Sequence, residues 1–159
     1  MLQVSCSDVT IDNPFALNEI AILRKETSAA ICMNATLTGY KLANYRGDGL
    51  VVATPTGSTA YNLSCGGPII EPTTSNIVVT PVSPHALTLR PLVLRDDSRI
   101  EVTTQSRSHS YQLSIDGRTV SCPSGSTISI AKAPFSVKVI LRHGQDFAQK
   151  LRTKLLWGK

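Results

Sequence analysis

The sequence predicts an all-β fold, a strand-rich sandwich with one short internal helix and an amphipathic helix at the C-terminal end. Apolar residues recur mainly at every second position or in short β-branched runs, and clusters of Gly, Pro, Asn and Ser separate these runs. The chain has 159 residues, of which 42% are hydrophobic and 17% charged, which is enough apolar material for one core. We therefore expect residues 1–159 to form a single domain.

The expected strands are short, as in a pair of packed sheets. In chain order they cover residues 20–23, 50–53, 77–80, 87–94, 100–103, 128–130 and 137–141. A β-hairpin is expected in addition between the fifth and sixth of these strands. Apolar and polar residues alternate from Tyr111 to Ile115, Asp116-Gly117 then favours a two-residue turn, and Val120 resumes the pattern.

A hydroxyl-rich turn follows the second predicted strand. It reads T-P-T-G-S-T-A-Y from Thr54 to Tyr61, and a Gly-Gly-Pro run follows shortly after. We expect a short helix here, capped by Ser58 or Thr59 and ended by the glycines. The N–H groups and the positive end of such a helix suit a ribose hydroxyl or a phosphate. The alternative, about equally favoured by the local pattern, is that the hydroxyls only cap their own helix.

The last predicted element is a terminal amphipathic helix within residues 146–159. Phe147, Leu151 and Leu155 recur at four-residue spacing, and Lys and Arg residues occupy other faces of the helix. The apolar stripe requires a surface to cover it.

Composition narrows the function classes. Sixteen Lys and Arg against 11 Asp and Glu give a formal net charge of +5, which favours acidic partners such as phosphates, although a solvated basic surface is the simpler explanation. The 4 Cys form no C-x-x-C pair and the 3 His lie far apart, so we expect free thiols and no metal site. No apolar run has the length of a membrane helix, and the first residues lack signal-peptide features, so the expected location is the cytoplasm.

Single motifs leave several interpretations open. The turn is not a Walker A motif because no G-K-[ST] follows, and Gly47-Asp48-Gly49 lacks the third glycine of a dinucleotide fingerprint. The amide of Asn18 beside the carboxylate of Glu19 could read a base edge and a ribose diol, but a solvent-exposed pair at a strand edge is common.

In combination, these motifs resemble the C-terminal domain of the NAD kinases, which use ATP or polyphosphate to phosphorylate the adenosine 2′-hydroxyl of NAD. The matching segments are, in order, Ala16-Leu17-Asn18-Glu19, Gly47-Asp48-Gly49-Leu50, T-P-T-G-S-T-A-Y at 54–61 with Gly66-Gly67-Pro68, Pro84-His85, Arg90-Pro91-Leu92, Asp116-Gly117, Lys154-Leu155 and Trp157-Gly158. The order, the spacing and the intact T-P-T-G-S-T-A-Y turn make the match specific.

The resemblance implies an NAD-binding and oligomerisation domain, with dimers or tetramers expected. Asn18 and Glu19 would hold the adenosine part of NAD, and Arg46 and Asp48 would meet the nicotinamide part, partly across a subunit boundary. The complete set of implied substrate-binding residues is Asn18, Glu19, Arg46, Asp48, Thr56, Thr59, Ala60, Tyr61, Asn62, Leu63, Ser64, Asp116 and Arg118. In the complete enzyme, ATP or polyphosphate would act with a divalent metal such as Mg²⁺.

One family motif is missing. Gly-Gly-Asp-Gly, whose aspartate the resemblance implies as the base for the ribose hydroxyl, does not occur in the sequence. We therefore expect no catalytic residue in this chain, no NAD kinase activity from the chain alone, and a terminal helix that packs on an absent amino-terminal α/β domain. Two rivals stay open: a basic nucleic-acid-binding β module, for which the 3 Phe, 4 Tyr and 1 Trp supply few stacking platforms, and a purely structural oligomerisation domain.

Overall fold

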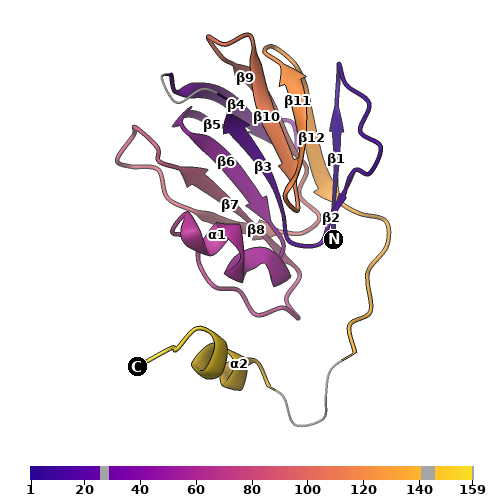
Figure 1. Ribbon diagram of the computed structural model, residues 1–159, viewed down its shortest axis with the longest axis vertical. Coiled ribbons are helices and arrows are strands. Elements are labelled where there is room, and N and C mark those ends of the chain that lie inside the picture. The colour runs from indigo at the N-terminus through magenta and orange to yellow at the C-terminus, as the bar shows by residue number, and fades with distance from the viewer. Residues whose placement is uncertain (26–28, 141–145, 159) are drawn as a thin grey trace.

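The computed structural model describes residues 1–25, 29–140 and 146–158. Within them, two six-stranded antiparallel sheets pack face to face (Figure 1). The first sheet has the order β2 (Phe15–Ala16), β1 (Leu2–Cys6), β12 (Thr127–Lys132), β9 (Ile100–Gln105), β4 (Ile31–Leu37) and β5 (Tyr40–Gly47). The second has the order β11 (Arg118–Pro123), β10 (Ser110–Ile115), β3 (Glu19–Arg24), β6 (Gly49–Ala53), β7 (Asn76–Val82) and β8 (Leu92–Arg95). The predicted all-β sandwich is thus confirmed.

The core lies between the two sheets and follows the period-two pattern of the strands. In β10, Tyr111, Leu113 and Ile115 point inward and are at most 1% exposed, while the residues between them are partly exposed. The hydroxyl of Tyr111 reaches Ser126 Oγ at 2.7 Å, so this large ring is buried without losing its hydrogen bond. The predicted hairpin at Asp116-Gly117 joins β10 to β11 in the expected register, with Ile115 opposite Arg118.

Strand β6 is buried on both faces, and this fixes the position of the hydroxyl-rich turn. Val51 and Ala53 point away from the main core and form a second cluster with Ala21 and Val78, against which Cys65 packs. All five residues of β6 are buried, which explains its uninterrupted apolar run. The 3₁₀ helix η1 (Thr56–Thr59) and the helix α1 (Tyr61–Ser64) lie directly after β6 and cover this outer face.

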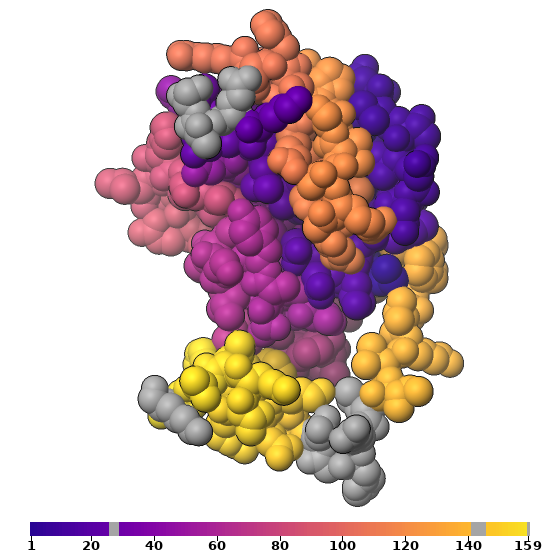
Figure 2. Space-filling view, in the orientation of Figure 1, coloured from indigo at the N-terminus to yellow at the C-terminus, as the bar shows by residue number. Residues whose placement is uncertain are grey.

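The terminal helix α2 (Phe147–Lys154) is formed as predicted. Asp146 caps it, because its Oδ1 accepts a hydrogen bond of 2.6 Å from the Gln149 N–H. Arg152 and Lys154 lie in the last turn, where positive charges interact favourably with the negative end of the helix dipole. No residue of α2 is buried. Figure 1 places it beyond the ends of the strands. Figure 2 shows it at the same end of the molecule as the segment around α1. No helix among the described residues has the length and apolar character needed to cross a membrane.

Three sequence predictions about the elements were wrong. Residues 137–140 form no strand, and Ile140 is 98% exposed, because the alternating apolar residues there have no neighbouring strand edge; residue 141 lies outside the described residues. The strand expected at 87–94 is reduced to β8, since Leu87 is 87% exposed in a loop that ends at Pro91. Side-chain capping of the short helix is absent: neither η1 nor α1 has a side-chain cap.

Strands β1, β2, β4 and β5 were not predicted. Their polar residues, such as Asn34 and Asn44 opposite each other in β4 and β5, dilute the apolar signal. They are strands because the ladder partners in the first sheet supply their backbone hydrogen bonds.

Candidate functional site

The centre of the candidate site is the three-residue segment 17–19, whose backbone is held by two side chains. The Asp116 carboxylate accepts hydrogen bonds from the N–H groups of Leu17, Asn18 and Glu19 at 2.6, 2.9 and 3.0 Å. The Thr54 hydroxyl donates to the Leu17 carbonyl at 2.6 Å, and the Thr54 N–H donates to the Asn18 carbonyl at 2.8 Å. The Glu19 carbonyl accepts from the Asp116 N–H at 3.1 Å. All six backbone polar groups of the segment are therefore satisfied by Asp116 and Thr54.

The hydroxyl-rich turn lies against the same segment. A Cβ atom on Gly57 would come within 2.1 Å of the Asn18 carbonyl oxygen and 2.5 Å of the Asn18 Cα. Only glycine permits this approach of two backbones. The Gly57 N–H also donates to Thr54 Oγ1 at 3.0 Å, so the end of β6, the start of η1 and segment 17–19 form one rigid corner.

The polar side chains of the turn divide into two groups. Ser58 is fully buried, and its hydroxyl accepts from the Ile70 N–H at 3.0 Å and donates to the Pro55 carbonyl at 2.7 Å. The side chains of Thr56, Thr59 and Ser64 are exposed. Figure 2 shows the segment around residues 55–68 at the surface, between the strands and the terminal helix. The first group holds the fold and the second is accessible to a ligand.

Asn62 belongs to the buried group. Its Nδ2 donates to the carbonyls of Ser58 and Pro68 at 2.9 and 3.1 Å, and its Oδ1 accepts from the Thr80 hydroxyl at 2.6 Å. A Cβ atom on Gly67 would lie 2.1 Å from Asn62 Oδ1, so the second glycine of the Gly-Gly-Pro run is required by packing. Asn62 joins α1 to β7. Its side chain is not exposed to a ligand.

Glu19 carries an unsatisfied polar atom. Its Oε2 is buried and has no hydrogen-bond partner among the described residues. Burial, and then the negative charge of Asp116, raise the pKa of the Glu19 carboxyl, while a hydrogen bond from the Tyr61 backbone opposes this rise. A buried carboxylate oxygen without a donor is costly, and a ligand hydroxyl would supply that donor.

Tyr61, Cys65 and Asp48 share the electrostatic environment of Glu19. Burial raises the pKa of the Tyr61 hydroxyl, and Cys65, Asp48 and Glu19 raise it further. Burial also raises the pKa of the Cys65 thiol, and a hydrogen bond with Tyr61 opposes this effect. At 38% exposure, Tyr61 still presents part of its ring to solvent. The arrangement therefore combines an aromatic face, an acceptor carboxylate and exposed hydroxyls in one place.

Asp48 and Arg46 lie where the chain crosses from β5 to β6. Asp48 forms an ion pair with Arg24, with 3.0 Å between Asp48 Oδ1 and Arg24 Nε. Arg46 is exposed on the other sheet, where it lines a surface hollow of about 380 Å³ together with Cys32, Gln105 and Arg107. Within one copy of the chain, Asp48 acts electrostatically on Tyr61, whereas Arg46 and Glu19 lie on different sheets.

Arg118 and Asp116 come from the β10–β11 turn. The Arg118 guanidinium donates to the carbonyls of Asn13 and Phe15 at 3.1 and 2.7 Å, so it holds the chain that leads into segment 17–19. Ala60, between η1 and α1, and Leu63, on α1, are half-buried. Thr54 was considered as a hydroxyl of the turn but was missing from the predicted site. The signal that could have identified it is its position at the end of a fully buried strand.

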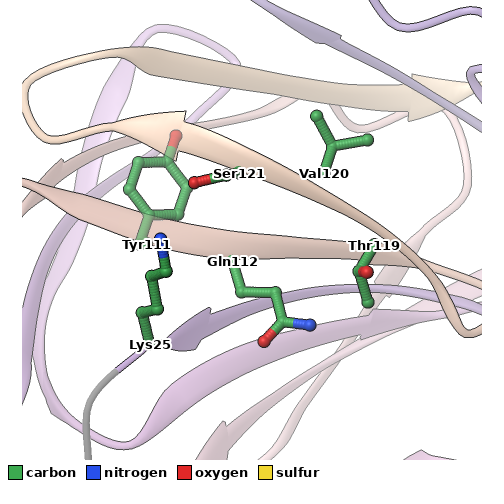
Figure 3. Close-up of a pocket in the computed structure, with 6 residues that line it drawn as sticks. All are labelled: Lys25, Tyr111, Gln112, Thr119, Val120 and Ser121. Atoms are coloured by element: carbon green, nitrogen blue, oxygen red, sulfur yellow. The ribbon is translucent and has the colours of Figure 1, made fainter.

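Hollows also occur elsewhere on the surface. One of about 230 Å³, shown in Figure 3, lies over β10 and β11 and is lined by Lys25, Tyr111, Gln112, Thr119, Val120 and Ser121. It lies over the hairpin strands and includes none of the residues of the candidate site. Among the described residues, no group of three His, Cys, Asp or Glu side chains could hold a metal ion.

Comparisons with known proteins identify the family of the chain. Residues 17–142 match the family described as ATP-NAD kinase C-terminal domain. The chain is 46% identical over 159 residues to the NAD kinase of Bacteroides fragilis and 49% identical over 158 residues to that of Porphyromonas gingivalis, covering 99% and 97% of this chain. In each case it covers 55% of the relative, so the chain spans about half the length of these curated relatives.

Two solved structures share the fold. Yeast NADH kinase, crystallised with NADH, is 25% identical with a TM-score of 0.88, and the match covers 99% of this chain and 49% of the yeast chain. The NAD kinase of Archaeoglobus fulgidus, in complex with ATP, is 32% identical with a TM-score of 0.73, covering 84% and 51%. The chain therefore belongs to the NAD kinase family and corresponds to its C-terminal domain.

Proposed function

We propose that this chain is the NAD-binding part of an NAD kinase, an enzyme that transfers a phosphoryl group from ATP or polyphosphate to the adenosine 2′-hydroxyl of NAD. Family membership supports the reaction, and the yeast relative crystallised with NADH supports the class of ligand. The observation that carries the proposal is the buried, unpartnered Oε2 of Glu19 beside the accessible face of the turn. A ribose hydroxyl is a donor of the kind that this oxygen lacks.

Each accessible side chain then has a role toward the dinucleotide. Glu19 accepts hydrogen bonds from the ribose hydroxyls, and the amide of Asn18 recognises the adenine edge. Thr56, Thr59 and Ser64 offer exposed hydroxyls to the polar groups of NAD, and the exposed part of Tyr61 offers a ring on which a planar group can stack. Ala60, Leu63 and the buried Asn62 shape the surface on which these groups stand.

The nicotinamide part would lie near Asp48 and Arg46. Because Arg46 is on the other sheet, we propose that it acts on the site of a second copy of the chain, in a dimer or tetramer. This assembly would make each site composite. Size-exclusion chromatography with light scattering tests it: a dimer or larger species is expected, and a strict monomer at high concentration would contradict it.

Phosphoryl transfer depends on positioning of the reactants and on stabilisation of the charge that develops. The chain's own residues bind and orient the acceptor hydroxyl. The base for that hydroxyl and the groups that hold the phosphates would come from an additional amino-terminal α/β domain, against which residues 146–159 would pack. Leu155 and Trp157, which follow α2 and are 37% and 59% exposed, are apolar residues that such a domain would cover, and they support this arrangement.

Isothermal titration of NAD into the purified chain tests the binding role. We expect the wild-type chain to bind NAD and Glu19→Gln to weaken binding roughly tenfold, because a charge-assisted hydrogen bond is lost. Glu71→Gln is the matched control, since Glu71 is an exposed carboxylate at the surface. Equal affinity of both variants and the wild type would remove Glu19 from the site, and absence of binding by the wild type would favour a purely structural domain.

A further inference from the structure

We propose that Asp116 and Thr54 are positioning residues, which fix segment 17–19 so that the side chains of Asn18 and Glu19 remain free for the dinucleotide. This inference rests on the proposed function. It assigns Asp116 a different role from direct contact with the substrate, which the resemblance implied. It also adds Thr54, which the predicted site did not contain.

The hydrogen bonds of Asp116 argue for positioning. Its two carboxylate oxygens already accept three N–H groups from segment 17–19, one at Oδ2 and two at Oδ1. A carboxylate offers about four acceptor positions, so little capacity remains for a ligand. Convergence of consecutive N–H groups on one anion is also a strong local interaction, because each hydrogen bond is charge-assisted.

The turn that carries Asp116 is built for this contact. Asp116 has φ +47° and Gly117 has φ +80°, a left-handed pair typical of a tight hairpin turn. Asp tolerates this conformation better than most residues. The Asp116 N–H also donates to the Glu19 carbonyl, and the Arg118 guanidinium donates to the Asn13 and Phe15 carbonyls. The turn therefore forms hydrogen bonds along the chain that leads into β3.

Thr54 holds the same segment together with Asp116, and we call these two residues the clamp. Thr54 is 6% exposed, its hydroxyl donates to Leu17 and accepts from Gly57, and its own N–H donates to Asn18. With every backbone group of the segment engaged, the segment cannot turn its own N–H groups or carbonyls toward a ligand. The side chains that extend from it, Asn18 and Glu19, are then the groups left for recognition.

The clamp also places two negative charges close together. The charge of Asp116 contributes to the raised pKa of the Glu19 carboxyl. Removing that charge therefore lowers the Glu19 pKa. Because a loss of burial lowers this pKa as well, the readout that distinguishes the arrangement is the pKa together with the amide signals of segment 17–19.

The test uses Asp116→Asn in the complete 159-residue chain, with Asp97→Asn as control. Asn retains the left-handed turn but removes the charge and replaces one acceptor oxygen with a donor. Asp97 is an exposed carboxylate that pairs with Arg95 at the surface, and it lies outside the site. Three measurements follow: ¹H–¹⁵N NMR of the Leu17, Asn18 and Glu19 amides, the NMR titration of the Glu19 side chain, and NAD affinity by calorimetry.

For Asp116→Asn we expect large shifts of these three amides and a lower Glu19 pKa. We also expect NAD binding to weaken about tenfold or more. Asp97→Asn should match the wild type in all three measurements. A second pair isolates the Thr54 hydroxyl: Thr54→Ser should bind NAD like the wild type, and Thr54→Val should bind it about tenfold more weakly. Unchanged amides in Asp116→Asn, or equal affinities for Thr54→Ser and Thr54→Val, would overturn the positioning role. Absence of NAD binding by the wild type would instead overturn the proposed function.

Discussion

At the scale of single residues, the motif T-P-T-G-S-T-A-Y separates polar groups that hold the fold from polar groups that remain accessible. Thr54 and Ser58 are buried and fully engaged, while Thr56 and Thr59 are exposed. Sequence reasoning predicted the turn and its association with Asn18 and Glu19. It could not assign the individual hydroxyls, because Ser and Thr at a helix start satisfy either role, and only their tertiary partners decide between them.

Glu19 leads to a prediction about stability and pH. Because the folded-state pKa of Glu19 is raised, the folded chain is favoured at low pH and loses this advantage as the pH rises through the folded pKa. Glu19→Gln removes the buried charge, so we expect the variant to unfold at a higher temperature than the wild type at pH 7, with the difference disappearing below pH about 4. Thermal unfolding followed by circular dichroism at several pH values measures this, and a variant less stable than the wild type at pH 7 would contradict it.

For Asn62 we predict that substitution lowers the stability of the chain, because its buried side chain holds neighbouring elements together. Asn62→Ala leaves the Thr80 hydroxyl and the Ser58 and Pro68 carbonyls without this partner, so we expect a loss of about 2–4 kcal/mol in the free energy of unfolding. Urea unfolding measures the loss. Asn44→Ala, at an exposed position of β5, is the control and should change stability by less than about 0.5 kcal/mol. Equal stabilities of the two variants would show that the Asn62 network contributes nothing.

At the scale of elements, the site depends on how closely β6, η1 and the start of β3 approach one another. The strands with a clear period-two pattern, such as β10, were predictable from sequence, and so was the helix α2. Strands β4 and β5 were not, because polar residues such as Asn34 and Asn44 interrupt their pattern and ladder partners decide their structure. The run at 137–140 shows the reverse case, a suitable pattern without a neighbouring strand.

The contact between Gly57 and Asn18 can be tested by one added methyl group. In Gly57→Ala the new Cβ would lie 2.1 Å from the Asn18 carbonyl oxygen, so segment 17–19 must shift. We expect a loss of about 1–3 kcal/mol in stability together with loss of detectable NAD binding. Gly125→Ala is the control: its φ is +96° and its Cβ meets nothing within 4 Å, so it should cost about 1 kcal/mol from backbone strain and leave NAD affinity unchanged. NAD binding by Gly57→Ala at the wild-type affinity would contradict the close approach.

At the scale of the whole molecule, the chain has a sandwich core between its two sheets and a terminal helix, α2, of which no residue is buried. The periodicity of the sequence predicted the sandwich and the terminal helix, and the resemblance implied that this helix packs on another domain. The chain covers about half of its curated relatives. Composition and periodicity alone could predict the fold class. The composite nature of the proposed site could not be derived in that way, because Arg46 and Asp48 are close in sequence and yet Arg46 lies on a different sheet from Glu19.

The proposed division between this NAD-binding chain and an additional α/β domain predicts that NAD binding and catalysis are separable. The purified chain should form no NADP from NAD with ATP or polyphosphate as donor, because we propose that the base and the phosphate-binding groups lie outside it. An enzymatic cycling assay for NADP measures this, with the NAD kinase of Bacteroides fragilis as the positive control. NADP formation that follows the purified chain through chromatography would contradict the division.

The most direct test of the central claim is a titration of the ¹⁵N-labelled chain with NAD, followed by ¹H–¹⁵N NMR. If the corner formed by segment 17–19 and the hydroxyl-rich turn binds the adenosine end of NAD, then the amides of Asn18, Glu19, Thr59 and Tyr61 should shift together along one saturable curve. The amides of Gln112 and Ser121, which pair on β10 and β11 away from the Asp116 turn, should stay in place. Saturable shifts confined to other parts of the chain, or no shifts at millimolar NAD, would contradict the account.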